Sequence, residues 1–172
     1  MKALQRLGTG VAFIGGFTFI AVLYVSAYWE PDIRWLHFLQ SWMYIVSLVL
    51  LLRGSKWGCF IGAAAALFWD YVNVFVTTFF RNGLEQAHAL LQTGHVTRPD
   101  FLISVPACLG NLALILGALL VYVAAPGKQW SDVGRLLLAL AGTMAFFAGA
   151  MALAQPRYLP LFKGALHPQW RL

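Results

Sequence analysis

Residues Trp57–Phe80 read WGCFIGAAAALFWDYVNVFVTTFF, and Asp70 is the single charged residue among them. A run of this length and hydropathy crosses the hydrocarbon core of a bilayer, which takes about 20 apolar residues. An ionised side chain at that depth costs about 2.5–3.5 kcal/mol, so it marks a functional site or a buried polar partnership. Asp70 is therefore the first candidate functional residue.

The composition of the whole chain is that of a membrane protein. Its 172 residues are 60% hydrophobic and 10% charged, with a mean hydropathy of +0.73, whereas soluble domains carry about 25% charged residues. The net charge is +6, but the basic residues are scattered over connectors and tails. Membrane lipids are thus the expected partner and nucleic acid is not. The sequence predicts an all-α, polytopic membrane bundle, with residues 1–172 forming a single membrane-embedded domain.

Apolar runs of spanning length occur five times, separated by short connectors that carry turn residues. The predicted spans are Leu7–Trp29, Trp35–Leu52, Trp57–Phe80, Phe101–Ala125 and Val133–Ala154. Tryptophans stand near several of the span ends, where an amphipathic indole suits the membrane interface. The sequence Val25-Ser26-Ala27 also resembles a signal-peptidase site, and cleavage there would leave four spans. We expect the first helix to be retained, because its apolar run exceeds that of a usual signal peptide.

The charges of the connectors predict an orientation. The side of the N-terminus holds six cations, Lys2, Arg6, Arg53, Lys56, Lys128 and Arg135. With five spans the tail adds Arg157, Lys163 and Arg171 to the other side and makes the totals equal, so the prediction depends on the connectors. Those of the other side hold only three cations, Arg34, Arg81 and Arg98. We therefore expect a cytoplasmic N-terminus, in a bacterial inner membrane. Most titratable side chains then gather on the outer side, namely His37, His88, His95, His167, Glu30, Asp32, Glu85 and Asp100.

Two segments outside the spans have features of their own. In the connector Arg81–Asp100, Leu84, Ala87 and Leu91 recur at helical spacing, which predicts a short helix lying in the membrane interface. The tail, Gln155–Leu172, contains three prolines between aromatic residues. It is predicted to be irregular, and either to lie on the lipid headgroups or to bind a partner.

Polar side chains follow one face on each of three predicted spans. Gly58, Gly62, Ala66 and Asp70 stand four residues apart, so Asp70 lies on a small-residue face that lets a neighbouring helix approach closely. The same face continues through Asn73 and Thr77 to Arg81. The second span contributes His37, Gln40 and Tyr44, and the fourth contributes Ser104, Cys108 and Asn111. Because polar faces are most stable when turned away from lipid, we expect them to meet inside the bundle.

Three interpretations of this polar centre remain open. In the first, it lines a small cavity in which Asp70 acts as proton carrier, cation ligand or acid–base residue. In the second, it holds the helices in register by hydrogen bonds. In the third, it contacts a partner subunit. The candidate ligand-binding residues are Asp70, Asn73, Tyr44, Gln40, His37, Asn111 and Trp69. If the protein is an enzyme, Asp70 and His37 are the candidate catalytic pair.

A metal site is not predicted. His88, His95 and Glu85 are weak candidate ligands, but no HxxxH or HxxH spacing occurs, and zinc or copper requires three or four converging side chains. No cofactor is predicted. The two cysteines, Cys59 and Cys108, lie within apolar runs and are expected to be buried, small apolar residues.

The sequence favours a binding or accessory role over catalysis. It contains neither GxSxG nor GxxxxGK[ST], the motifs of nucleophilic and phosphate-binding sites. In length, number of spans and tryptophan content it is similar to the translocator-protein family, but it lacks that family's loop signature, so the likeness assigns no residues. The main hypothesis is a small membrane protein that binds a lipophilic ligand or docks as an accessory subunit.

Two alternatives accompany this hypothesis. The first is a small proton- or ion-coupled transporter that uses Asp70. The second is a membrane enzyme that acts on a lipid, isoprenoid or sterol-like substrate. A partner membrane protein or a second copy of the chain is an expected partner in the accessory or transport roles.

Overall fold

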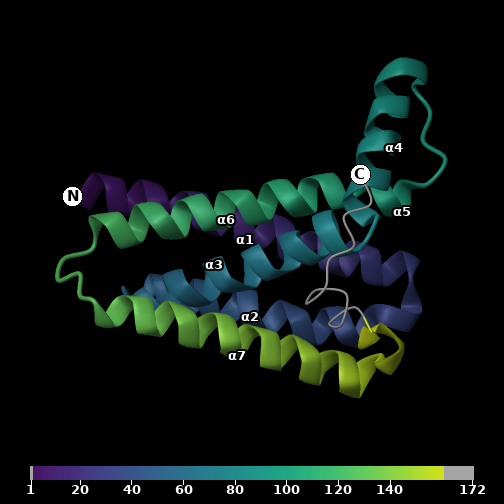
Figure 1. The fold of residues 1–172 in the computed structure, drawn as a ribbon. Helices are drawn as coiled ribbons and strands as arrows, with labels where there is room; N and C mark the ends of the chain where they lie inside the picture. Colours follow the sequence, from purple (N-terminus) through teal and green to yellow (C-terminus); the bar gives the residue numbers. More distant parts are fainter. Residues whose placement is uncertain (1, 161–172) are drawn as a thin grey trace.

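A computed structural model describes residues 2–160 of the chain, and the described residues form helices joined by short turns. Five helices are long and apolar enough to cross a membrane, which confirms the predicted all-α bundle. They lie side by side along one direction (Figure 1). These helices are α1 (Lys2–Trp29), α2 (Arg34–Leu52), α3 (Lys56–Tyr71), α6 (Ser104–Ala124) and α7 (Ser131–Ala154).

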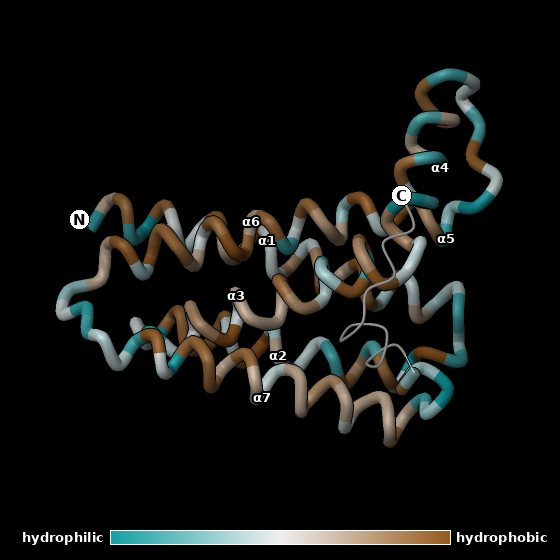
Figure 2. Tube along the Cα trace, in the orientation of Figure 1, coloured by the Kyte–Doolittle hydropathy of each residue, from teal (hydrophilic) through white to brown (hydrophobic). Residues whose placement is uncertain are grey.

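Shorter elements connect these helices, mostly at the end of the bundle opposite the N-terminus (Figure 1). They are η1 (Pro31–Ile33), the π-helical turn η2 (Val72–Val76), α4 (Phe79–Thr93), α5 (Pro99–Leu102) and η3 (Pro156–Tyr158). The predicted tail beyond residue 160 lies outside the described residues. Apolar residues dominate the long helices, and polar residues gather at the two ends and along α4 (Figure 2).

Glycines bring α1 and α6 into backbone contact. A Cβ added at Gly15 would lie 2.5 Å from the backbone nitrogen of Leu114, and one at Gly110 would lie 2.9 Å from the carbonyl oxygen of Gly15. A Cβ at Gly8 would lie 2.8 Å from the backbone nitrogen of Val121. These approaches allow tight packing in lipid, where apolar surface burial drives helix association less than it does in water. The first helix is thus a structural part of the bundle.

The predicted small-residue face of the third span packs as expected. Gly58, Gly62 and Ala66 are all buried, and a Cβ at Gly58 would lie 2.5 Å from the backbone nitrogen of Leu51 on α2. The Ser47 hydroxyl donates a hydrogen bond of 2.9 Å to the carbonyl oxygen of Gly58. Helix α7 completes the bundle by packing against α3 and α2.

An ionic cluster ties together three elements at the end of the bundle that holds the N-terminus. The Asp132 side chain is 2% exposed, and its carboxylate accepts hydrogen bonds of 2.8 Å from both Lys56 and Arg135. The hydroxyl of Tyr122 and the backbone N–H of Gln129 donate to the same carboxylate, at 3.2 and 3.1 Å. Asp132 thereby joins the start of α7 to the start of α3 and the end of α6.

The third span ends earlier than the sequence predicts. After α3 the chain forms the π turn, in which the N–H of Thr77 donates to the carbonyl oxygen of Val72 at 2.9 Å. Thr77 is extended, with ψ 172°, and its side-chain oxygen accepts a hydrogen bond from the N–H of Phe79. Phe79 and Phe80 therefore belong to α4. The expected polar face does not continue to Arg81, which is exposed and pairs with Glu85.

Helix α4 runs across the direction of the bundle (Figure 1). A helix in this direction lies along the membrane surface when the bundle spans the bilayer. It ends at Gly94, whose φ of +71° is a left-handed conformation that glycine adopts without strain. The interfacial helix that Leu84, Ala87 and Leu91 predict is therefore present, over Phe79–Thr93.

Candidate functional site

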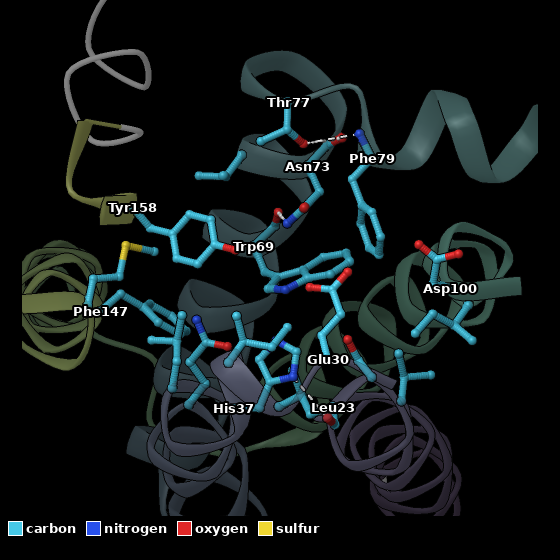
Figure 3. A pocket seen from close by; sticks show the side chains of 18 of the residues that line it. Leu23, Glu30, His37, Trp69, Asn73, Thr77, Phe79, Asp100, Phe147 and Tyr158 are labelled. Carbon is cyan, nitrogen blue, oxygen red and sulfur yellow. Dashed lines mark hydrogen bonds between the residues drawn. The ribbon is translucent and has the colours of Figure 1, made fainter. Parts of the chain in front are cut away.

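A cavity of about 240 Å³ lies among the ends of the helices, on the side opposite the N-terminus. Helices α1, α2, α3, α4 and α7 and the short elements η1, η2, α5 and η3 all contribute to its lining. Figure 3 shows the side chains that point into it. Most of the lining is apolar, and the polar or titratable contributors are Ser26, Glu30, His37, Gln40, Asn73, Thr77, Asp100 and Tyr158.

His37 is held in one tautomer by the backbone of the neighbouring helix. Its Nδ1 lies 2.9 Å from the carbonyl oxygen of Leu23 on α1. A carbonyl oxygen only accepts, so Nδ1 donates the proton, and in the neutral ring Nε2 is a hydrogen-bond acceptor. A partly buried imidazole with a free Nε2 therefore lines the cavity.

Two amides place further acceptors on the cavity wall. The side-chain oxygen of Gln40 is buried and has no hydrogen-bond partner among the described residues, and Gln40 is 6% exposed. The amide nitrogen of Asn73 donates to the carbonyl oxygen of Trp69 at 2.9 Å. That bond directs the donor side of Asn73 back to its own helix. The Gln40 oxygen is covered by its neighbours, so a ligand in the cavity does not reach it, and a buried acceptor without a partner costs about 1–3 kcal/mol.

A second polar group lies within the bundle, beside the cavity rather than in its lining. Asn111 on α6 donates a hydrogen bond of 3.0 Å from its amide nitrogen to Asp70 on α3. Tyr44 on α2 is fully buried near both of these side chains. Three oxygens of this group have no hydrogen-bond partner among the described residues, namely Asp70 Oδ2, the Tyr44 hydroxyl and Asn111 Oδ1.

Aromatic rings connect the two polar groups. The ring of Phe19 stacks on Tyr44 with centroids 4.3 Å apart and meets Trp69 edge-on at 4.9 Å. Trp69 faces the cavity, and Tyr44 belongs to the buried group. The rigid packing of these three rings fixes the wall between the cavity and Asp70.

The structure thus divides the predicted ligand-binding residues into two sets. The residues that line the cavity are His37, Gln40, Trp69 and Asn73, and those that form the neighbouring buried group are Tyr44, Asp70 and Asn111. The single cluster expected from the sequence is therefore two clusters. Asn73 points to the cavity because it lies in the π turn, which shifts the helix face by part of a turn.

Sequence reasoning did not select several residues of the lining. Glu30 follows the last residue of α1, Asp100 lies in α5, and Tyr158 reaches the cavity from η3. The sequence evidence for Glu30 and Asp100 was that most titratable residues fall on the predicted outer side of the membrane. No sequence pattern marks Tyr158, because its position depends on how α7 ends.

The charged groups near the cavity mouth are partly paired. Arg98 binds Asp100 through two hydrogen bonds, of 2.9 and 2.6 Å. The Asp100 carboxylate raises the pKa of the Arg98 guanidinium above its ordinary value, because these hydrogen bonds favour the charged form. Asp32 pairs with Arg157 at 3.4 Å. Glu30 forms no ion pair with any described residue.

The described residues contain no group of three or more His, Cys, Asp and Glu side chains that could hold a metal ion. His88 and His95, the weak candidate ligands, belong to no such group among the described residues, and Glu85 pairs with Arg81 at 3.4 Å. Cys59 and Cys108 are free and buried, as the sequence predicts.

Comparisons with protein-family models, curated proteins and solved structures give no match for this chain.

Proposed function

We propose that this protein binds a small lipophilic ligand in the cavity formed by the outer ends of its spans. The observation that carries the proposal is the cavity itself, with apolar and aromatic walls and a few converging polar groups. Ligand sites have this composition, because the apolar wall supplies affinity and the polar groups fix orientation. The Nε2 of His37 is the acceptor that would orient the ligand.

The position of the cavity suits a ligand that enters from the membrane. Four of the five spans, α1, α2, α3 and α7, line it together with α4 and α5, and α4 lies across the bundle (Figure 1). We place this end on the outer side of a bacterial inner membrane and the N-terminus in the cytoplasm. The six cations of the N-terminal side support this orientation.

The arrangement supports a binding site more than an acid–base pair. His37 lines the cavity, whereas Asp70 does not. The two side chains proposed to act on one substrate therefore do not share a wall of the cavity. A role as an accessory subunit or in a homo-oligomer remains compatible with ligand binding, because both roles would use outer faces of the bundle.

Proton-coupled transport is the second candidate, and one observation favours it. Asp70 Oδ2 lies within the bundle without a hydrogen-bond partner among the described residues. A protonated carboxyl could donate from this atom, whereas a carboxylate would leave it unsatisfied. Proton flux into liposomes that Asp70→Asn abolishes would support this candidate over simple ligand binding.

Native mass spectrometry tests the proposed function. The protein, released from its own membrane in dodecyl maltoside, should retain a small molecule of defined mass. Ser26→Phe places a ring in the cavity and should remove that molecule, because Ser26 is one of the lining residues. Val25→Phe is the matched control, since Val25 is 42% exposed and lies outside the lining. Identical retention in both variants, or none in the wild type, would contradict the proposal.

A further inference from the structure

The walls of the cavity are rich in aromatic rings. Six of the lining residues are aromatic, Phe68, Trp69, Phe79, Phe101, Phe147 and Tyr158. They come from α3, α4, α5, α7 and η3, so they surround the cavity from several sides. Trp69 meets Phe79 edge-on with centroids 6.3 Å apart, and Phe79 meets Phe101 at 6.0 Å. Aromatic faces attract a cation, and two of these rings already hold one: Arg98 lies 4.3 Å from the ring centroid of Phe101, and Arg157 lies 5.1 Å from that of Tyr158. Trp69 has no such contact among the described residues.

A carboxylate reaches into the same space. Figure 3 shows the Glu30 side chain pointing into the cavity toward the ring of Trp69. The guanidinium of Arg98 is close enough to Glu30 for an electrostatic attraction, but it is bound to Asp100 by two hydrogen bonds. Glu30 has no ion pair among the described residues. Its charge is therefore available to a ligand.

The remaining polar groups of the cavity also favour a donor or a positive charge. The Nε2 of His37 accepts. No lysine or arginine from the described part of the chain lines the cavity. An anionic ligand would meet this acceptor and the Glu30 carboxylate, whereas a cation is attracted by the carboxylate.

From these observations we infer that the ligand of the cavity is an organic cation, an amphiphile with an ammonium head. The head lies between Glu30 and the ring of Trp69, and the apolar part lies against the walls. The inference rests on the proposed function and names the chemical class of its ligand. A metal cation does not fit, because the lining offers aromatic rings where a metal needs several oxygen or nitrogen ligands.

The test compares two probes that have the same shape and a different charge. Benzyltrimethylammonium carries a quaternary nitrogen, and neopentylbenzene has carbon in its place. Binding of each is measured by titration calorimetry on the full chain in dodecyl maltoside, a detergent without an ammonium group. Comparison of wild type with variant for each probe cancels the partition of that probe into the micelle. 3-Phenylpropionate serves as the anionic probe.

The decisive variant is Glu30→Gln, which keeps the shape and removes the charge. It should weaken binding of the cation about fivefold to tenfold, the range expected for loss of a partly solvated charge contact. Binding of the neutral probe should stay within about twofold. Asp32→Asn is the matched control, because Asp32 is an acid two residues away that pairs with Arg157 and lies outside the lining. It should leave both probes unchanged.

The outcomes separate this inference from the proposed function. Equal affinity for the cation and its neutral isostere, or a cation affinity that Glu30→Gln does not change, overturns the assignment of an organic cation and leaves ligand binding intact. No saturable binding of any probe, together with an empty cavity in native mass spectrometry, overturns both. Competition by phosphatidylethanolamine distinguishes the source of the ammonium group: displacement of the probe identifies a lipid headgroup, and no displacement identifies a free amphiphilic amine.

Discussion

At the scale of single residues, buried polar atoms decide which side chains matter. Asn111 donates one hydrogen bond to Asp70, Tyr44 lies beside them, and one oxygen of each of the three side chains has no partner among the described residues. Asp132 instead has four donors around one carboxylate. The sequence predicts the importance of Asp70, because a lone acid in an apolar run is conspicuous. The sequence does not predict the importance of Asp132, because its partners Lys56 and Tyr122 come from distant parts of the chain.

Replacing Asp70 tests the hydrogen bonds of the buried group. Asp70→Leu should destabilise the protein by about 1–3 kcal/mol, because it removes the acceptor of the hydrogen bond that the buried amide nitrogen of Asn111 donates. Asp70→Asn should cost less, since an amide oxygen still accepts from Asn111. Thermal unfolding in nanodiscs measures both. Equal unfolding temperatures of the two variants would show that the hydrogen bond from Asn111 to residue 70 does not contribute to stability.

Replacing Asp132 tests the ionic cluster at the other end. Asp132→Asn should lower the unfolding temperature by several degrees, because Lys56 and Arg135 lose a shared carboxylate that is 2% exposed. Asp32→Asn is the control, since the Asp32–Arg157 pair is exposed on both sides and contributes little. A similar change in the two variants would contradict a structural role for the buried carboxylate.

At the scale of elements, hydropathy predicts the spans, and local hydrogen bonds set their ends. All five predicted spans are present, with ends that differ by a few residues. The end of the third span was predicted wrongly, because no proline or glycine marks the π turn at Val72–Val76. The turn follows from the extended backbone of Thr77 and its bond to Phe79. Such local hydrogen bonds follow no periodic pattern of residues, so they cannot be predicted from hydropathy.

The contact between α1 and α6 gives a prediction at this scale. Gly15→Ala should destabilise the bundle by about 1–3 kcal/mol, because the added Cβ would lie 2.5 Å from the backbone nitrogen of Leu114 and would push the helices apart. Gly10→Ala is the matched control, since a Cβ there meets nothing within 4 Å. Thermal unfolding compares the two variants, and a harmless Gly15→Ala would contradict the close packing.

The placement of α4 gives a second prediction for an element. Spin labels at Leu84 and Leu91, on its apolar face, should be reached by oxygen dissolved in the lipid. A label at Glu85, whose carboxylate is 62% exposed, should be reached by a water-soluble nickel complex. Paramagnetic relaxation of the three labels in nanodiscs measures this difference. Equal access of the nickel complex to all three would place α4 away from the membrane surface.

At the scale of the whole molecule, the cavity joins segments that are far apart in the sequence. His37, Gln40 and Trp69 are predictable members, because helical spacing places them on polar or interior faces. Glu30 and Tyr158 enter through the ends of α1 and α7, so their positions depend on the assembled bundle. The cavity therefore arises from the packing of the spans, whereas its polar residues on α2 can be predicted from the sequence of that helix.

Photo-cross-linking tests the central claim, ligand binding in the cavity, most directly. Benzoylphenylalanine replaces Phe101, which lines the cavity, or Phe38, which is 38% exposed and lies outside the lining. After irradiation in the native membrane, the protein is analysed by intact mass spectrometry. The account predicts an adduct of one defined small mass at position 101 and a spread of phospholipid masses at position 38. The same phospholipid adducts at both positions would contradict it.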